Sequence, residues 1–511
     1  TIQQPGDVYE LELQMQGINK KELKDALDIF VTYDPMNLGN PISYQILGNE
    51  KQMKVKFAAP KYGAHVKLDF KPSKLDKPFS LKEISVLVAE KVLKDNKGEV
   101  TDRRYMDASL PVEERVESLL AVMTPEDKME LIREGWGIPG IPHLYVPPIT
   151  KVEAVHGFSY GSGATIFPQA LAMGATWNRK LTEEVAMVIG DETVAANTKQ
   201  AWSPVLDVAQ DARWGRCEET FGEDPVLVSQ IGGAWIKGYQ SRGLFTTPKH
   251  FGGHGAPLGG RDSHDIGLSE REMREIHLVP FRHAIRNYDC QSLMMAYSDY
   301  MGVPVAKSKE LLQQILRQEW GFKGYVVSDS EAVEFVAGKH KVADTYEDGI
   351  AQCVNAGLNV RTNFTAPDEF IIPLRKAIAD GKISFDTVDK RVAEVLRVKF
   401  WLGLFDNPYR GDGKLAEKIV HSKEHQAVAL DAARQSLVLL KNEKEMLPLS
   451  KSIRKVAVIG PNAEEKKQLI CRYGPANAPI KTVFQGIKEM LPDAEVVYRK
   501  GCDIIDPHFP E

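Results

Sequence analysis

Apolar and polar residues alternate with a period of two along the first hundred residues, a pattern typical of strands with one buried face. Turns rich in Asn, Gly, Pro and Lys separate the segments YELELQM, DIFVTYD, ISYQIL, KQMKVKFA, AHVKLDF and LKEISVLVA. Six short strands in about a hundred residues predict a small β-sandwich over residues 1–104. We expect it to be an accessory domain, either with a spacer or docking role or, as in sandwiches associated with other enzymes, with a carbohydrate-binding role.

The pattern changes near residue 105, where helical periodicity begins. From about residue 150 to 405, apolar segments of strand length alternate with amphipathic helices. The candidate strands are AWSPVLDV, LFTTPKHF, SLMMAYS, GYVVSDS and LNVRT. Their nearly continuous apolar residues are typical of parallel strands covered by helices. The alternation predicts a (β/α)8-type barrel over residues 105–411.

A third pattern follows residue 411. A helical segment, HQAVALDAARQSLVLL, precedes two strand-like segments, KVAVIGP and AEVVYRKG. This order predicts the N-terminal part of an α/β sandwich domain over residues 412–511, with few of its elements completed. The fold class expected for the whole chain is α/β: a (β/α)8-type barrel, preceded by a small β-sandwich and followed by the start of an α/β sandwich.

The composition argues against several classes of function. Net charge is −5, from 65 basic and 70 acidic residues without a long basic run, so no nucleic-acid partner is expected. No apolar run reaches the roughly 18 residues of a membrane span, and the cysteines form no CxxC pair. His250, His254 and His264 suggest a metal site, but the glycines around His254 disfavour the helix it would need. We expect no metal and no cofactor.

Polar residues that end apolar strands are the candidates for chemistry, because the loops after parallel barrel strands converge on one face. Asp329 follows the apolar run GYVV and Ser328. A partly desolvated carboxylate at this position suits a nucleophile that attacks an oxocarbenium-like centre. The alternative role is an N-cap of the helix beginning with EAVEF.

Hydrogen-bond donors end other strands. Lys249 and His250 follow LFTTP, and both side chains can donate to sugar hydroxyls. Arg213, in DARWGR, offers a forked donor suited to vicinal hydroxyls. The Tyr297 hydroxyl can hold the Asp329 carboxylate, or its ring can be part of the core. Nearby acidic residues are expected to orient the Arg213 loop through ion pairs, namely Asp207, Asp211, Glu218 and Glu219.

Several motifs, in their expected order, resemble glycoside hydrolase family 3 from about residue 105 to the end of the chain. They are VEAVHGF, GATIFPQALAMGATWN, PVLDVAQDARWGRCEETFGEDP, KHFGGHGAPLGGRDSH, MMAYSDYMGVP, WGFKGYVVSDSEAV and VAVIGPNA. The resemblance implies a barrel followed by an α/β sandwich, with the sugar bound between them. It also implies retention of anomeric configuration, with a second carboxyl about 5–5.5 Å from the nucleophile.

Carried over residue by residue, the resemblance makes Asp329 the catalytic nucleophile. It implies that the sugar in subsite −1 is bound by Glu153, Arg213, Lys249, His250, Met294 and Tyr297. Among these, Glu153 would receive the hydroxyls on the far side of the ring.

This chain departs from the family pattern at three places. Ser330 follows the nucleophile where many relatives have Trp or Cys, which leaves the choice of sugar open. Glu153 stands where an Asp is common, a feature reminiscent of β-xylosidase-like members that favours a pentose. The general acid of two-domain members is a Glu well beyond the VAVIGP strand, so it is expected beyond Glu511.

The function implied is that of a retaining exo-β-glycosidase, which releases terminal glucose or xylose from an oligosaccharide or aryl glycoside. One alternative is a β-N-acetylglucosaminidase with an Asp262/His264 dyad, and another is a non-catalytic sugar-binding barrel. The resemblance implies a periplasmic or secreted protein, and a homo-oligomer is compatible with it.

Overall fold

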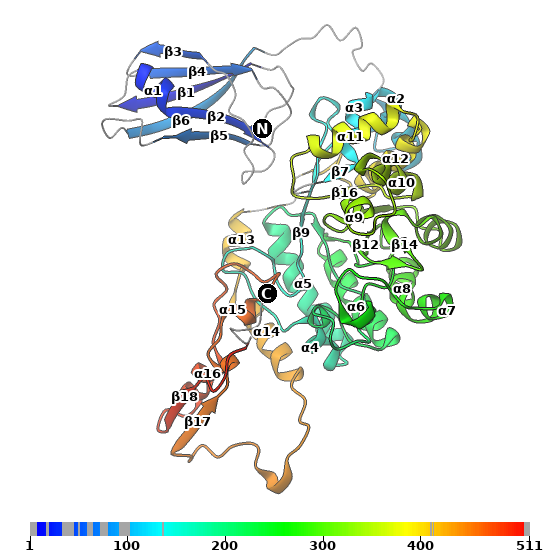
Figure 1. Ribbon diagram of the computed structural model, residues 1–511. Coiled ribbons are helices and arrows are strands. Elements are labelled where there is room, and N and C mark those ends of the chain that lie inside the picture. The colour runs from blue at the N-terminus through cyan, green and yellow to red at the C-terminus, as the bar shows by residue number, and fades with distance from the viewer. Residues whose placement is uncertain are drawn as a thin grey trace. The chain divides into compact units, whose positions relative to one another are not determined.

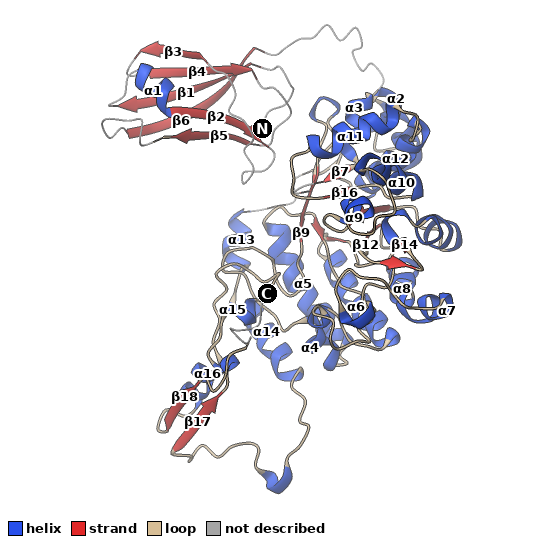
Figure 2. Cartoon of the chain, viewed as in Figure 1, coloured by secondary structure: helices blue, strands red, loops and turns tan. Residues whose placement is uncertain are grey.

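The computed structural model describes residues 8–16, 20–32, 45–49, 52–58, 65–71, 80–90, 103–134, 137–408, 411 and 413–504. The chain divides into two compact units. The first unit comprises Thr1–Ile149 and Ser330–Pro408, and the second comprises Thr150–Asp329 and Tyr409–Glu511. Helices and strands are both abundant (Figure 1, Figure 2), so the coarse α/β class predicted from the sequence is confirmed.

All six strands predicted in the first hundred residues are present. An antiparallel sheet has the order β3 (Gln45–Asn49), β4 (Gln52–Ala58), β1 (Val8–Gln16) and β6 (Ser80–Glu90). β2 (Leu27–Thr32) pairs in antiparallel fashion with β5 (His65–Phe70). A helix that was not predicted, α1 (Lys20–Ala26), buries Leu23 and Ala26. That the two sheets stack as a sandwich stays a prediction.

The rest of the first unit is mainly helical. Several helices start at capping side chains: Thr124 forms a capping box with Asp127, and Ser384 accepts from the backbone N–H of Thr387. The short strands β7 (Arg133–Glu134) and β16 (Arg361–Thr362) pair in parallel. The other elements are α2 (Val112–Val122), α3 (Pro125–Leu131), β8 (Gly137–Ile138), α9 (Ala332–Gly338), α10 (Tyr346–Ala356), α11 (Asp368–Ala379) and α12 (Phe385–Trp401).

The strands of the second unit that lead to the site pair in parallel. β10 (Gln200–Ala201) lies between β9 (Ile149–Val152) and β11 (Phe245–Thr246), and β12 (Ser292–Met295) pairs with β15 (Tyr325–Ser328). A parallel bridge between Phe251 and Met295 links the segment after β11 to β12. Every residue of β10, β11, β12 and β15 is buried, as expected for parallel strands covered on both faces.

Helices follow these strands. The large ones are α5 (Arg179–Ala195), which begins after the cap Asn178, and α6 (Pro225–Ser241), which begins after Asp224. They pack so closely that a Cβ on Gly238 would lie 2.6 Å from the Cβ of Ala186, so only glycine fits there. The smaller elements are α4 (Ala170–Ala175), α7 (Glu270–Glu272), a π-helix (Met273–His277), α8 (Val279–Tyr288), β13 (Asp299–Tyr300), β14 (Val303–Pro304) and a π-helix (Glu310–Glu319).

The C-terminal segment adds a parallel strand pair to the second unit, β17 (Lys455–Ile459) with β18 (Glu495–Arg499). Both strands were predicted from the apolar runs KVAVIGP and AEVVYRKG. The helices of this segment are α13 (Gly413–Ile419), α14 (Lys423–Gln435), α15 (Lys467–Ile470) and α16 (Val483–Met490).

The parallel pairing and the mixed α/β content agree with the predicted class, but a closed eight-stranded barrel and an α/β sandwich stay predictions. The same holds for the division into residues 1–104, 105–411 and 412–511. Among the described residues, no helix combines the length and the apolar character needed to cross a bilayer.

His277, at the end of a π-helix, should make folding stability depend on pH. It is 1% exposed, and neither ring nitrogen has a hydrogen-bond partner among the described residues. Burial lowers its pKa from 6.5 to about 4, so the unfolded chain binds a proton more readily than the native protein between these pH values. The neutral imidazole should contribute about 3 kcal/mol of stability above pH 6.5, lost as pH falls through 4.

The measurement is the free energy of unfolding at pH 7.5 and at pH 5 for the native chain and for His277→Leu, which cannot titrate. The native chain should lose more stability between the two pH values than the variant does. Equal losses would show that His277 is already charged in the folded protein.

Candidate functional site

The predicted site residues come from the carboxyl ends of the parallel strands in the second unit. Glu153 follows β9, Asp329 follows β15, and Tyr297 lies two residues after the end of β12. Lys249 and His250 come three and four residues after β11, where Val205 forms a parallel bridge with Lys249. Parallel strand ends share one edge, which explains why residues far apart in sequence meet here.

A buried ion pair joins Lys249 and Glu153. Lys249 Nζ donates to Glu153 Oε2 at 2.5 Å, and the two residues are 1% and 9% exposed. Burial opposes the charge of the amine, but the negative charge of Glu153, with a smaller contribution from Glu219, outweighs it and raises the pKa of Lys249. Lys249 is therefore an ammonium group at neutral pH.

His250 stands between two carboxyl groups. Asp207 Oδ2 lies 2.7 Å from Nδ1 and also accepts from the His250 backbone N–H at 3.1 Å, while Asp329 Oδ2 lies 3.3 Å from Nε2. Burial raises the pKa of Asp207 to about 8 and lowers that of His250 well below 6.5. The Asp207–His250 pair thus shares one proton instead of forming an ion pair.

Arg216 is the forked donor of this cluster. It is 4% exposed, and its Nε and Nη2 donate to the two carboxylate oxygens of Glu219 at 2.9 Å each. Nη2 also lies 3.0 Å from His250 Nε2, and Nη1 lies 3.2 Å from His254 Nε2. Because a guanidinium only donates, His250 Nε2 accepts from it. The proton of the neutral imidazole is therefore on Nδ1, the ring nitrogen that faces Asp207.

Arg213, which was predicted to grip the sugar, is not brought to this cluster. Its side chain is 72% exposed, and its guanidinium bonds to the Asp211 carboxylate. The buried residue of the loop between them is Trp214, 2% exposed, and Arg216 turns inward instead. The arginine that reaches the cluster is therefore Arg216, the second of Arg-Trp-Gly-Arg, and not Arg213 as predicted. The predicted ion pairs of this loop exist, with Asp211 on Arg213 and Glu219 on Arg216.

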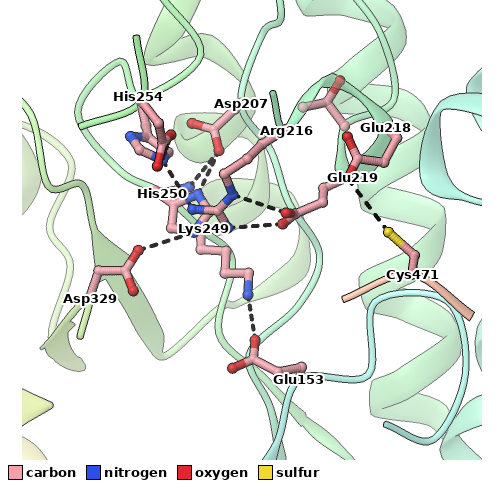
Figure 3. Close-up of polar contacts among 12 residues, drawn as sticks. Glu153, Asp207, Arg216, Glu218, Glu219, Lys249, His250, His254, Asp329 and Cys471 are labelled. Atoms are coloured by element: carbon pink, nitrogen blue, oxygen red, sulfur yellow. Dashed lines mark hydrogen bonds and ion pairs between the residues drawn. The ribbon is translucent and has the colours of Figure 1, made fainter. Parts of the chain in front are cut away.

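Asp329 is 8% exposed and has a second neighbour in Tyr297. Burial, the charge of Asp329 and a hydrogen bond to it raise the pKa of the Tyr297 hydroxyl, so this group stays protonated and donates to the carboxylate. Met294 is 1% exposed in β12, where it is in register with Val327 of β15. Figure 3 shows Asp329 beside His250 and Glu153 at the tip of the Lys249 side chain, so the two carboxylates contact different members of the cluster.

His254 belongs to the cluster as well. Positive φ angles of 113° at Gly252 and 86° at Gly253 let the chain turn back, so that the rings of His254 and His250 lie 4.6 Å apart. Asp262 Oδ1 accepts from the Trp214 indole at 2.8 Å and lies 3.3 Å from His254 Nε2.

His264, the proposed dyad partner of Asp262, is exposed. Asp262 therefore has Trp214 and His254 as neighbours, whereas the dyad would require His264 beside it. Among the described residues, no three His, Cys, Asp or Glu side chains are grouped as metal ligands.

A segment that the sequence did not indicate, residues 470–476, covers one side of the site. The Tyr473 ring lies 4.8 Å from Lys249 Nζ, and the backbone is bonded to loop 156–163 at four places. These bonds join Ile470 O to His156 Nε2, Tyr473 O to Ser159 Oγ, Gly474 O to the Tyr160 N–H and Ala476 O to the Gly163 N–H. Nearby, Cys471 Sγ lies 3.7 Å from Glu218 Oε1 (Figure 3).

Sequence comparisons relate the chain to known proteins. The family profile "Glycosyl hydrolase family 3 N terminal domain" matches residues 141–398, and "Glycosyl hydrolase family 3 C-terminal domain" matches residues 437–504. A "Beta-xylosidase" of Formosa agariphila is 33% identical over 77% of this chain and 57% of its own length. A "Periplasmic beta-glucosidase" of Salmonella typhimurium is 31% identical over 72% of this chain and 48% of its own length.

Among solved structures, a β-glucosidase from Erythrobacter marinus superposes with a TM-score of 0.72 at 29% identity, covering 78% of this chain and 60% of the other. This chain thus spans about half the length of the curated relatives it matches.

Proposed function

The chain belongs to glycosyl hydrolase family 3, and from this premise we propose that it is a retaining, exo-acting β-glycosidase that releases terminal glucose or xylose. The observation that carries the proposal is the position of Asp329. Its carboxylate lies at a buried strand end, 3.3 Å from His250 and bonded to the Tyr297 hydroxyl. The cationic donors Lys249 and Arg216 belong to the same cluster.

The proposed reaction has two displacements. One Asp329 oxygen attacks the anomeric carbon, the bond to the leaving oxygen breaks with its electron pair, and that oxygen takes a proton. Water then attacks the anomeric carbon of this glycosyl ester and loses a proton to solvent, while the bond between that carbon and Asp329 breaks and restores the carboxylate. The second inversion gives the released sugar the β configuration of the substrate. The hydrogen bond from the Tyr297 hydroxyl orients the Asp329 carboxylate toward the anomeric carbon.

The cluster also suits recognition of a terminal sugar. Lys249, Arg216 and Glu153 present an ammonium, a guanidinium and a carboxylate with buried polar atoms, and a sugar ring offers hydroxyls that both donate and accept. The Tyr473 ring lies beside Lys249. Exo action is supported by a solved structure that is 26% identical and is titled a GH3 exo-β-xylosidase.

The relatives' names extend the proposal. Curated relatives are named as β-xylosidases and β-glucosidases, which supports an oligosaccharide or aryl glycoside substrate with terminal xylose or glucose. The name of the Salmonella relative supports export to the periplasm or beyond. The matched ranges 141–398 and 437–504 support a (β/α)8-type barrel over residues 105–411 and an α/β sandwich domain that begins near residue 412.

The test uses 2,4-dinitrophenyl β-glucoside and β-xyloside, because such leaving groups need little protonation and the reaction then does not depend on a general acid. We expect release of dinitrophenolate from at least one of them. Proton NMR of the first-formed sugar should show the β anomer. Release of the α anomer would exclude the double displacement, and absence of release from both glycosides would support a non-catalytic sugar-binding protein.

A matched panel tests the N-acetylglucosaminidase alternative. The position of Asp262 against Trp214 and His254 leads us to expect no preference for the N-acetylglucosaminide, and His264→Ala should leave glycoside turnover unchanged. Selective loss of N-acetylglucosaminide hydrolysis in this variant would instead support the dyad.

A further inference from the structure

His254 is a fully buried imidazole that has no role in the reaction proposed above. Its exposed fraction is 0%, and its ring lies 4.6 Å from the ring of His250. A Cβ on the next residue, Gly255, would lie 2.6 Å from Val208 O, so the loop can approach Val208 only with glycine at this position. The local backbone therefore brings His254 into the interior of the cluster.

The contacts of His254 define which of its ring nitrogens accepts a hydrogen bond. Nε2 lies 3.2 Å from Arg216 Nη1 and 3.3 Å from Asp262 Oδ1, and Nδ1 lies 3.5 Å from Ser298 Oγ. Because a guanidinium only donates, Nε2 accepts from Arg216, and the ring proton is on Nδ1, where the Ser298 oxygen can accept it. The Asp262 carboxylate has another donor, the Trp214 indole at 2.8 Å.

Arg216 is held on two edges of its guanidinium. Glu219 accepts from Nε and Nη2, while His250 and His254 accept from Nη2 and Nη1. Figure 3 shows Glu219 and the two imidazoles on different sides of Arg216. A guanidinium has five N–H groups, and these four bonds leave one N–H of Nη1 that they do not use.

We propose that His254 is a positioning residue for the sugar site, where its neutral imidazole and that of His250 hold the Arg216 guanidinium in one orientation. This inference rests on the proposed function. With Glu219 as its only partner, the guanidinium could still tilt relative to the carboxylate. The bonds to the two imidazoles remove this freedom, so Arg216 presents its donor to a sugar hydroxyl in a fixed direction.

NMR of the chain with ¹⁵N-labelled histidine tests the contact between His254 and Arg216 without any sugar. The signals that disappear in His254→Gln belong to His254. At neutral pH, its Nε2 should have the chemical shift of an unprotonated ring nitrogen and its Nδ1 that of a protonated one. A proton on Nε2 would overturn the inference, because this nitrogen could then not accept from Arg216.

Calorimetry with free xylose and free glucose tests the effect on the site. His254→Leu removes the acceptor and should weaken binding of the better-bound sugar by about tenfold. His254→Gln has an amide oxygen as far from the backbone as Nε2, so its affinity should be within about threefold of the native value.

A double-mutant cycle tests whether His254 acts through Arg216. In the Arg216→Lys background, His254→Leu should weaken sugar binding by less than about twofold more, because the guanidinium that it orients is already absent. A loss of about tenfold in this background, as in the native one, would overturn the inference. Equal weakening in His254→Leu and His254→Gln would do so as well.

His283→Leu is the matched control. His283 lies on α8, where its Nδ1 is 2.7 Å from Asn287 Nδ2 and its ring packs against Tyr288. This variant should keep the native affinity, and circular dichroism establishes that each variant is folded. Failure of the native chain to bind either sugar would refute the proposed function itself, whereas the NMR measurement would still decide whether His254 accepts from Arg216.

Discussion

Replacement of Asp329 by asparagine should abolish the release of dinitrophenolate and the formation of a glycosyl-enzyme. The amide has the shape of the carboxylate but lacks the negative charge and the nucleophilic oxygen that the first displacement requires. We expect turnover to fall by about 10⁴-fold or more. The measurements are the steady-state rate with the better of the two aryl glycosides and the intact mass of the protein after rapid quenching.

The neighbours of Asp329 make this substitution informative. The Tyr297 hydroxyl can still donate to the amide oxygen, so the fold and the sugar pocket should persist. The variant should therefore bind the free sugar with close to native affinity. Asp348→Asn provides a control, because the Asp348 carboxylate pairs with Lys382 on the exposed surface and should not affect turnover. An Asp329→Asn protein with full turnover would remove the basis of the proposed mechanism.

The hydrophobic pattern predicted the strands of the site well. The apolar runs SLMMAYS and GYVVSDS contain β12 and β15, and each is followed at its carboxyl end by a residue of the cluster, Tyr297 and Asp329. The position of a strand end depends on local sequence, and parallel strands bring such ends together whatever the rest of the fold does. For this reason Lys249 and His250 could be anticipated as well, whereas Glu153 was assigned from the family resemblance.

Features that depend on irregular loops or on contacts between distant parts of the chain could not be predicted from the hydrophobic pattern. Arg213 and Arg216 flank Trp214 and Gly215 in a loop without periodicity, so the sequence does not indicate which guanidinium turns inward. Tyr473 reaches the site through a hydrogen bond to Ser159, 314 residues earlier in the chain. The amphipathic pattern between about residues 150 and 405 predicts helices, but it does not show that two of them, Met273–His277 and Glu310–Glu319, are π-helices.

Arg216→Ala should have the largest effect on the folded state among substitutions in the site. It would leave the Glu219 carboxylate, 2% exposed, without its bidentate partner. Breaking a buried ion pair in this way costs about 3–5 kcal/mol of unfolding free energy. His250 would also lose the donor to its Nε2, so its ring proton would no longer be held on Nδ1, the nitrogen that faces Asp207. Chemical denaturation followed by circular dichroism measures the stability.

Two further variants test two questions. One asks whether the guanidinium geometry of Arg216 matters beyond its positive charge, and the other asks whether Arg213 contributes to the site. Arg216→Lys keeps a cation near Glu219, but an ammonium cannot bond both Glu219 oxygens and His250 with the same planar geometry. It should therefore recover much of the stability and still bind sugar at least tenfold more weakly than the native chain. Arg213→Ala should match the native chain in both measurements, because that guanidinium is exposed and bonded to Asp211. Loss of sugar binding in Arg213→Ala, with native binding in Arg216→Lys, would restore the assignment made from the sequence.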